Sequence, residues 1–205
     1  SGMTSLVSVN SSGIQGNRQN ESPSISADGR FVSFTSTSTN LADNDTNATW
    51  DVFVHDRETG ETRCVSVNEL GDVGNLGSGV SFMAGNGRYV AFSSSARNFA
   101  NNNSSTWGHV YVYDLEEGTN TRVSVDTNGI RANATSSWPA ISSDGRYIAF
   151  HSVATNLVNG DNNGRQDVFV YDRLTETTEI ISVNSDGSQG NGDSNFPSIS
   201  GNGRY

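Results

Sequence analysis

Two loops of this 205-residue chain carry acidic and amide side chains at alternating places, a spacing that suits a bound metal ion. The segment N-G-D-N-N-G-R-Q-D at 159–167 has polar oxygens at its first, third, fifth and ninth places and a glycine at its sixth. The segment D-N-D-T-N-A-T-W-D at 43–51 has the same spacing. Calcium takes about six to eight hard oxygen ligands, which a short loop supplies from alternating side chains and a backbone carbonyl. The predicted Ca²⁺ ligands are Asp43, Asp45, Asn47, Asp51, Asn159, Asp161, Asn163 and Asp167.

A third stretch aligns with these two loops but contains no carboxylate. Residues 101–109 run N-N-N-S-S-T-W-G-H, so the four aligned places hold Asn101, Asn103, Ser105 and His109. Neutral oxygens alone bind calcium weakly, and we expect no ion in this copy. The competing interpretation is structural, because Asp and Asn side chains also close Asx-turns and could pair with arginines such as those that precede the second strands. The uncharged copy fits either interpretation.

The loops recur because the whole chain is a repeat with a period of 58 residues. The motif D-G-R-F-V-S-F begins at Asp28, and related motifs begin at Asn86, Asp144 and Asn202. The same step separates Asp51-Val-Phe-Val, His109-Val-Tyr-Val and Asp167-Val-Phe-Val. Several independent motifs that keep one period without insertion or deletion establish a repeat architecture.

Each repeat predicts four short strands. A two-residue D-G or N-G turn, in which both residues tolerate positive φ, is expected between the first and second strands. The loop of the predicted metal site joins the second strand to the third. In the first repeat the strands are expected at 22–26, 30–36, 51–55 and 62–67, with further first strands at 80–84, 138–142 and 196–200 and an earlier fourth strand at 6–9.

The second and third strands carry apolar residues on both faces, as Val52, Phe53 and Val54 illustrate. Sheets that are buried on both sides need this pattern. The fold class is therefore all-β: a β-propeller of four-stranded antiparallel blades with a 58-residue repeat, about three and a half blades in this chain. The alternatives are a one-dimensional β-solenoid or separate small sheets. We expect one segment over 1–205, with the last strand of a blade and a connector at 1–19, blades at 20–77, 78–135 and 136–193, and the start of a fourth blade at 194–205.

Composition excludes several classes of partner. The chain has 22 acidic and 12 basic residues and a formal charge of −10, which disfavours binding to nucleic acid or to an anionic membrane. One cysteine allows neither an intrachain disulfide nor a cysteine metal cluster. The sequence contains no signal peptide and no apolar run of the roughly 20 residues that span a bilayer.

Segments such as P-A-I-S-S-D-G-R-Y-I-A-F at 139–150 and the D-V-F-V-Y-D-R run that begins at Asp167 resemble the TolB-type, WD40-like propeller repeats of bacterial proteins. The resemblance covers essentially the whole chain. It implies a secreted or periplasmic propeller that serves as an interaction platform or lies beside an enzyme domain. The metal loops are similar to the D-x-D-x-D-G-x-x-D loops of integrin-type propellers. The second repeat departs most, with Ser81 where the other copies have proline.

No catalytic residues are predicted, because repeated residues belong to the scaffold and a catalytic site should interrupt the repeat. The three histidines, His55, His109 and His151, have no recognisable partner for a nucleophile triad. The arginines that recur at the second strands are expected to anchor turns or to pair with the aspartates that start the third strands.

The sequence therefore predicts a non-catalytic platform for a protein or glycan ligand, with calcium-stabilised loops. One alternative is the propeller part of a secreted enzyme whose catalytic residues lie outside this segment. Another is a repeat module that self-associates through its incomplete terminal blade.

Overall fold

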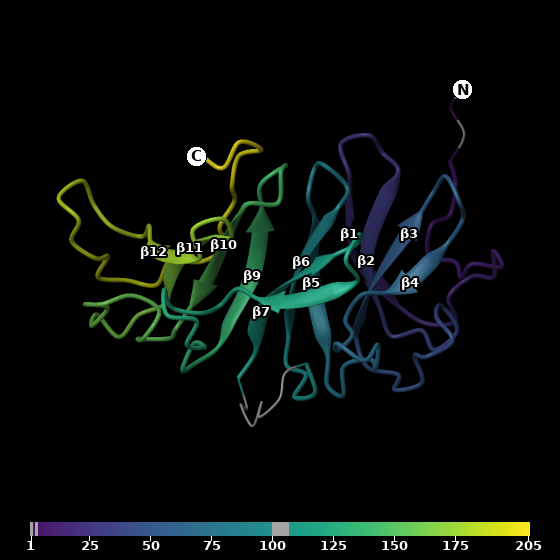
Figure 1. Ribbon diagram of the computed structural model, residues 1–205, viewed down its shortest axis with the longest axis horizontal. Helices are drawn as coiled ribbons and strands as arrows, with labels where there is room; N and C mark the ends of the chain where they lie inside the picture. The colour runs from purple at the N-terminus through teal and green to yellow at the C-terminus, as the bar shows by residue number, and fades with distance from the viewer. Residues whose placement is uncertain (1, 3, 100–106) are drawn as a thin grey trace.

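The computed structural model describes residues 2, 4–99 and 107–205, and its strands form three separate four-stranded antiparallel sheets (Figure 1). The sheets stand side by side like the blades of a fan, in chain order from the purple N-terminal end to the yellow C-terminal end (Figure 1). The first sheet contains β1 (Asn20–Ile25), β2 (Phe31–Ser36), β3 (Asp51–Asp56) and β4 (Thr62–Cys64). The second contains β5 (Ser78–Met83), β6 (Tyr89–Ser94), β7 (His109–Asp114) and β8 (Thr119–Arg122). The third contains β9 (Ser136–Ile141), β10 (Tyr147–Ser152), β11 (Asp167–Asp172) and β12 (Thr177–Ile180). The propeller class that the repeat predicts is confirmed, and the described part of the chain contains no helix that could span a membrane.

The central strands of each blade pair without interruption, whereas each first strand carries a bulge. β2 and β3 pair from Phe31 with Asp56 to Ser36 with Asp51. The register of the first strand shifts at the same place in every sheet. The bulged residue has a positive φ in each copy: 50° at Ser22, 47° at Val80 and 52° at Trp138. Bulges of this kind redirect side chains and protect an edge strand from pairing with another chain.

The core lies between adjacent blades, because the middle strands bury both faces. Every residue of β3 and of β7 is buried. An aromatic pair crosses each central strand pair, with ring centroids 5.8 Å apart for Phe34 and Phe53 and 5.9 Å apart for Phe92 and Tyr111. The apolar pattern on both strand faces therefore predicted the burial correctly.

Neighbouring blades also meet through their turns. The turn glycine of one blade packs on the aromatic ring that opens the second strand of the preceding blade, so Gly87 lies against Phe31 and Gly145 against Tyr89. A Cβ added at Gly87 would lie 2.9 Å from the ring of Phe31, which leaves no room for a side chain. Gly87 has a φ of 73°, a second reason why glycine is required here.

The hairpin turns differ from the predicted two-residue type. Gly29 has a positive φ of 75°, but Asp28 does not, and the loop is closed by the Ser26 N–H donating to Phe31 O at 2.9 Å. The Asp28 carboxylate instead accepts hydrogen bonds from Ser26 Oγ at 2.5 Å and from the Arg30 N–H at 2.9 Å. The longer loop forms because the side chain of Asp28 stabilises it.

The predicted pairing of arginines with strand-start aspartates was wrong. Arg30 Nη2 lies 2.7 Å from Asp56 Oδ2, at the end of β3, and Arg88–Asp114 at 2.7 Å repeats the pair. The second and third strands are antiparallel, so the start of one faces the end of the other. The same aspartate also accepts from the Glu58 N–H at 2.9 Å, so the arginine is tied to the turn after β3, in line with the other predicted role of these arginines as turn anchors.

Several strand boundaries also differ. Residues 6–9 form no strand and make only one bridge, between Val9 and Gln15. Residues 196–200 form no strand either, because no second strand pairs with them among the described residues and the Phe196 N–H donates to His151 Nδ1 at 3.2 Å. β4 begins at Thr62 as predicted but ends at Cys64, three residues before the predicted end at residue 67.

Candidate metal-binding loops

The two acidic loops join β2 to β3 and β10 to β11 and are anchored at both ends by buried residues. Leu41 and Leu157, each 1% exposed, pack in the cores of their blades. Asp51 and Asp167 are the first residues of β3 and β11, and both are fully buried. The rigid strand pairs thus fix the ninth place of each loop, while the intervening residues bend over it.

In the first loop, two carboxylates are buried near each other. Asp45 is 1% exposed, and its Oδ2 is buried without a hydrogen-bond partner among the described residues. Its Oδ1 accepts only a long bond of 3.4 Å from the Asn47 N–H. Asp51 Oδ1 accepts a hydrogen bond of 2.7 Å from Ser66 Oγ, whose own oxygen accepts from the Val52 N–H at 3.0 Å.

Burial makes the ionised forms of these carboxylates unfavourable. Desolvation is the main reason that the pKa of Asp51 rises to about 7, and the nearby negative charge of Asp45 adds to this rise. The pKa of Asp45 is also raised by burial. A bound proton or cation would therefore stabilise this pair of buried carboxylates.

The other acidic loop repeats the arrangement in the third blade. Asp161 is 8% exposed, and its Oδ1 is buried without a hydrogen-bond partner among the described residues. Its pKa is raised first by burial and then by the charge of Asp167. Asp167 accepts from Ser182 Oγ at 2.6 Å and from Asn163 Nδ2 at 2.8 Å. The pair of buried carboxylates at the third and ninth places is therefore common to both loops.

The amides at the fifth place tie each loop to the connector that leads to the next blade. Asn47 Nδ2 donates to Gly74 O at 2.9 Å, and Asn163 Nδ2 donates to Gly190 O at 3.1 Å. Their side-chain oxygens accept from the N–H groups two residues further on, as the 2.7 Å bond from Thr49 to Asn47 illustrates. The predicted Asx-turns thus coexist with the buried carboxylates.

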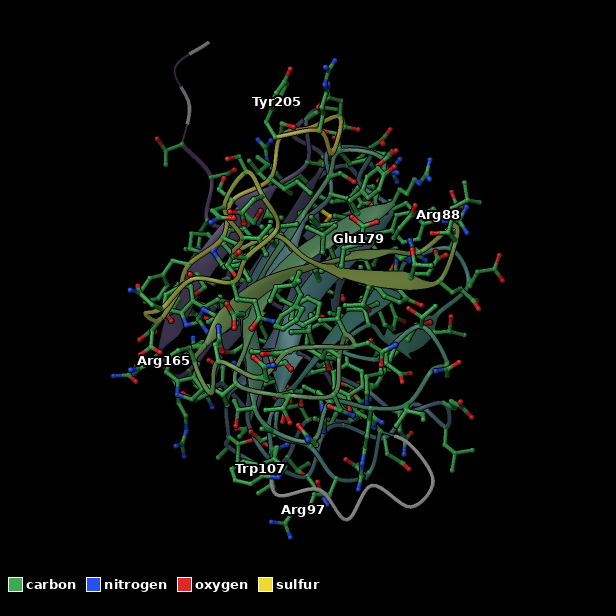
Figure 2. All side chains as sticks on the ribbon, turned by 90° about the vertical axis from the view of Figure 1, so that its left-hand side faces the viewer. Arg88, Arg97, Trp107, Arg165, Glu179 and Tyr205 are labelled. Atoms are coloured by element: carbon green, nitrogen blue, oxygen red, sulfur yellow. The ribbon has the colours of Figure 1, made fainter. Side chains whose placement is uncertain are left out.

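The first-place residues differ from the buried pairs in their exposure. Asp43 and Asn159 are both exposed, so these side chains remain at the rim of each loop. Arg165, also exposed, extends from the second loop into solvent at the edge of the molecule (Figure 2). The buried part of each candidate site consists of the third- and ninth-place aspartates beside the fifth-place amide.

The donor set favours a hard cation. Among the residues that the structure describes, no three His, Cys, Asp or Glu side chains gather into one metal cluster. Each loop offers two carboxylates plus amide and carbonyl oxygens, which matches calcium better than zinc or another metal that prefers nitrogen or sulfur ligands. Sequence reasoning missed the serines Ser66 and Ser182, although the V-S-V or I-S-V motif that carries them recurs in every repeat.

The uncharged copy is only partly described, because Asn101, Asn103 and Ser105 lie outside the described residues. His109 starts β7 at the place of the buried aspartates and is itself 1% exposed. Its Nδ1 lies 3.3 Å from Ser124 Oγ, so the repeated serine keeps its partner at the strand start. Burial lowers the pKa of His109 to about 4, which leaves the imidazole neutral at physiological pH.

One serine and one histidine meet in a geometry that resembles a nucleophile and its base. His151 Nε2 lies 2.8 Å from Ser137 Oγ. However, the Phe196 N–H donates to His151 Nδ1, so this nitrogen is an acceptor and Nε2 carries the proton. The histidine therefore donates to Ser137, which is opposite to the role of a general base.

Three blades of four antiparallel strands, two of which have a candidate cation loop between the second and third strands, define the fold of this chain as that of β-propeller blades. No family model matches the sequence, and no curated protein matches it. The fold is nevertheless similar to solved structures. A prolyl endopeptidase structure aligns with 80% of this chain and 22% of its own, at 15% identity and a TM-score of 0.52.

Two TolB structures are also similar. TolB from Acinetobacter baumannii aligns with 80% of this chain and 32% of its own, at 19% identity and a TM-score of 0.49. A putative TolB from Agrobacterium tumefaciens aligns with 77% of this chain and 47% of its own, at 15% identity and a TM-score of 0.46. At these identities each likeness is one of fold alone. This chain spans less than half of each of these proteins.

Proposed function

We propose that this propeller segment is a non-catalytic binding and structural platform whose loops 43–51 and 159–167 each hold a calcium ion. One observation carries the calcium part of the proposal. In both loops a buried aspartate, Asp45 or Asp161, has an oxygen without a hydrogen-bond partner in the described part of the chain, beside a second buried aspartate. Buried carboxylates need a proton, a hydrogen bond or a cation.

Calcium fits this need better than an arginine or a lysine does. The arginines of the described blades that form ion pairs are paired at the opposite ends of the third strands, with Asp56, Asp114 and Asp172. A calcium ion would complete its shell with amide or carbonyl oxygens of the loop and with water. Because Asn47 and Asn163 bond to the following connector, the ion would stiffen the link between consecutive blades.

The location that the resemblance implies is consistent with such sites. Sites with two carboxylates and several neutral oxygens have modest affinity, and extracellular calcium modules bind at about 10⁻⁴–10⁻³ M. A secreted or periplasmic protein meets calcium in that range. We therefore propose that the platform is secreted or periplasmic.

The second candidate function is the propeller part of a larger enzyme. It is favoured by the likeness in fold to a prolyl endopeptidase, of which this chain covers 22%. The Ser137–His151 pair does not support catalysis within the segment, since the proton lies on the nitrogen that faces the serine. Catalytic residues would have to lie in another part of such a protein. Activity of the isolated segment against a peptide substrate would overturn the non-catalytic proposal.

Calorimetric titration with CaCl₂ tests the calcium proposal. We expect two sites with dissociation constants of about 10⁻⁴–10⁻³ M, and a higher melting temperature in millimolar calcium. The variant with both Asp45→Ala and Asp161→Ala should lose both effects. Glu69→Ala, which removes an exposed carboxylate outside both loops, is the matched control and should retain them. A melting temperature that does not respond to millimolar calcium would refute the proposal.

A further inference from the structure

Three large aromatic residues interrupt the repeat on the first strands. Phe82 stands in β5 where the other three copies have Ser24, Ala140 and Ser198. Trp138 and Phe196 occupy the place that holds Ser22 and Val80 in the first two copies. Residues that depart from a repeat are not required by its scaffold, so these aromatic side chains need another explanation.

The fold brings the three aromatic residues together. They line one cavity of about 370 Å³ between the first strands β5 and β9 and the segment 196–199, with Met83, Ile141 and Pro197 among its other walls. The rings of Trp138 and Phe196 meet edge to face, with centroids 4.8 Å apart and an interplanar angle of 90°. The volume lies at the lower end of the roughly 300–1,000 Å³ range of ligand pockets.

These side chains remain accessible although they are apolar. Phe82 is 39% exposed and Trp138 is 42% exposed. The backbone at Trp138 and at Phe196 has a positive φ, 52° and 54°, which is rare for a bulky residue. The same bulge occurs at Ser22, so the scaffold sets the backbone and the aromatic side chains are an addition to it.

The terminal part of the cavity is held in place by the buried histidine of the third blade. His151 is 6% exposed, accepts from the Phe196 N–H and lies with its ring 5.8 Å from the ring of Phe196. The aromatic ring is therefore positioned although residues 196–200 form no strand. A fixed, open aromatic wall is typical of a site that receives a side chain of a partner.

The chemistry of the wall defines the occupant. No charged side chain lines the cavity, and Ser198 provides the single side-chain hydroxyl among its lining residues. Charge complementarity therefore favours a neutral ligand. The chain charge of −10 also disfavours anions. A sugar needs several polar partners, which this wall does not supply. An additional strand is disfavoured at β9, because Pro139 and the bulge interrupt its edge.

We propose that this cavity, lined by Phe82, Trp138 and Phe196, binds an aromatic side chain presented by an uncharged segment of a protein partner. The inference rests on the proposed platform function, because it names the ligand class of that platform, but it does not depend on calcium. Aromatic anchors in apolar pockets dominate the binding energy of many protein interfaces.

A capped tripeptide with a central tryptophan, acetyl-Gly-Trp-Gly-amide, is the probe. Titration followed by the NMR signal of the Trp138 indole N–H should show saturable binding about tenfold tighter than that of acetyl-Gly-Ala-Gly-amide, since a buried indole contributes at least the roughly 1.4 kcal/mol that corresponds to this factor. Free indole distinguishes a small-molecule site: if it binds as tightly as the tripeptide, the peptide source is refuted. Stronger binding of methyl glucoside would also overturn the proposal.

Substitutions taken from the repeat itself provide variants that retain the fold. Phe82→Ser and Phe196→Ser introduce residues that other copies hold at these places, and each should weaken tripeptide binding at least fivefold. Binding to these variants is measured from an NMR signal of the tripeptide, and Trp138 is not substituted in either variant. Leu70→Asn, which removes an 86% exposed apolar residue outside the cavity, is the matched control and should leave binding unchanged. Equal affinity of all three variants would refute the site. Calcium binding measured on the same variants separates failure of this site from failure of the calcium loops.

Discussion

Asp51 at the start of β3 and His109 at the start of β7 show what the scaffold requires at the ninth place of the loop. Asp51 and His109 occupy equivalent positions, are 0% and 1% exposed, and both contact the repeated serine of the fourth-strand segment. A blade therefore forms with either a carboxylate or a neutral imidazole there. The fold needs a hydrogen-bonding group at the ninth place but no negative charge. The buried charges of the first and third blades consequently point to a ligand.

The opposite ends of the third strands give the contrasting case. There Asp56 and Asp172 pair with arginines, and these ion pairs hold the pKa of both carboxyls well below the usual range. The pair recurs in all three described blades, as expected for a scaffold element. Aspartates with an arginine partner at one end, and aspartates without an ion pair among the described residues at the other, thus separate the structural carboxylates from the candidate ligands.

The largest expected effect comes from making the first and third blades resemble the second. The variant with Asp51→His and Asp167→His should fold, because His109 already occupies this place in β7. It should lose the calcium-dependent gain in stability, about 2 kcal/mol per site at a calcium concentration of ~50 times Kd. Differential scanning calorimetry with and without calcium measures this gain.

A neutral substitution at the equivalent place of the second blade serves as the control for this variant. His109→Asn should leave the calcium response of the other blades unchanged. If the double histidine variant keeps the full calcium response, the ninth-place aspartates are not ligands.

The second effect is an opposite pH dependence of the two blades in calcium-free protein. The pKa of Asp51 is about 7 in the fold and about 3.9 in unfolded chains. Its contribution to stability is therefore complete below pH 4 and is lost as pH rises to about 7. His109, with a pKa of about 4 against about 6.5 unfolded, contributes fully above pH 6.5 and loses this contribution as pH falls to about 4.

Single variants separate these two slopes. Each group changes the free energy of unfolding by at most about 1.4 kcal/mol per pH unit, with opposite signs. Asp51→Asn should therefore make the slope of stability against pH more positive between pH 4 and 7. His109→Asn should make this slope less positive. Urea unfolding at a series of pH values measures the slopes, and identical slopes in both variants would contradict this assignment. Calcium should suppress the Asp51 contribution, because the ion stabilises the carboxylate.

The smallest effect distinguishes the two acidic loops from each other. Their sixth place holds Ala48 in one and Gly164 in the other, with φ values of 55° and 63°. The left-handed conformation costs a non-glycine residue about 1–2 kcal/mol, so Ala48→Gly should stabilise the protein by up to about 1 kcal/mol. Gly164→Ala should destabilise it by a similar amount. Thermal melts of the two variants measure both changes. If both substitutions shifted the melting temperature in the same direction, the left-handed backbone conformation would not explain the effects.

Much of the fold could be predicted from the sequence, because the 58-residue period and the two-sided apolar strands are local properties of the chain. The period placed β2, β3 and their copies within a residue or two of their observed bounds. The edge strands were predicted less well, since β1 begins at Asn20 and β4 ends at Cys64. Edge strands have one neighbour, and their extent depends on bulges and bridges that propensity does not encode.

The eight loop residues selected as calcium ligands stay a prediction. The alternating spacing that selected them could not show that Asp45 and Asp161 are buried while Asp43 and Asn159 are exposed. It also assigned the wrong partners to the arginines. These properties depend on which strand end faces which, and antiparallel pairing decides that.

The sequence by itself determined the repeat, the four strands of each unit and the place where an acidic loop recurs, because these follow from periodicity over short distances. Only the tertiary structure decided which carboxylates lose their water and their partners, because desolvation depends on neighbours distant in the chain, as the contact of Ser66 with Asp51 illustrates. The meeting of Phe82, Trp138 and Phe196 in one cavity was likewise decided by the packing of blades. Each of these residues comes from a different repeat, and side-by-side stacking of the sheets is what joins them.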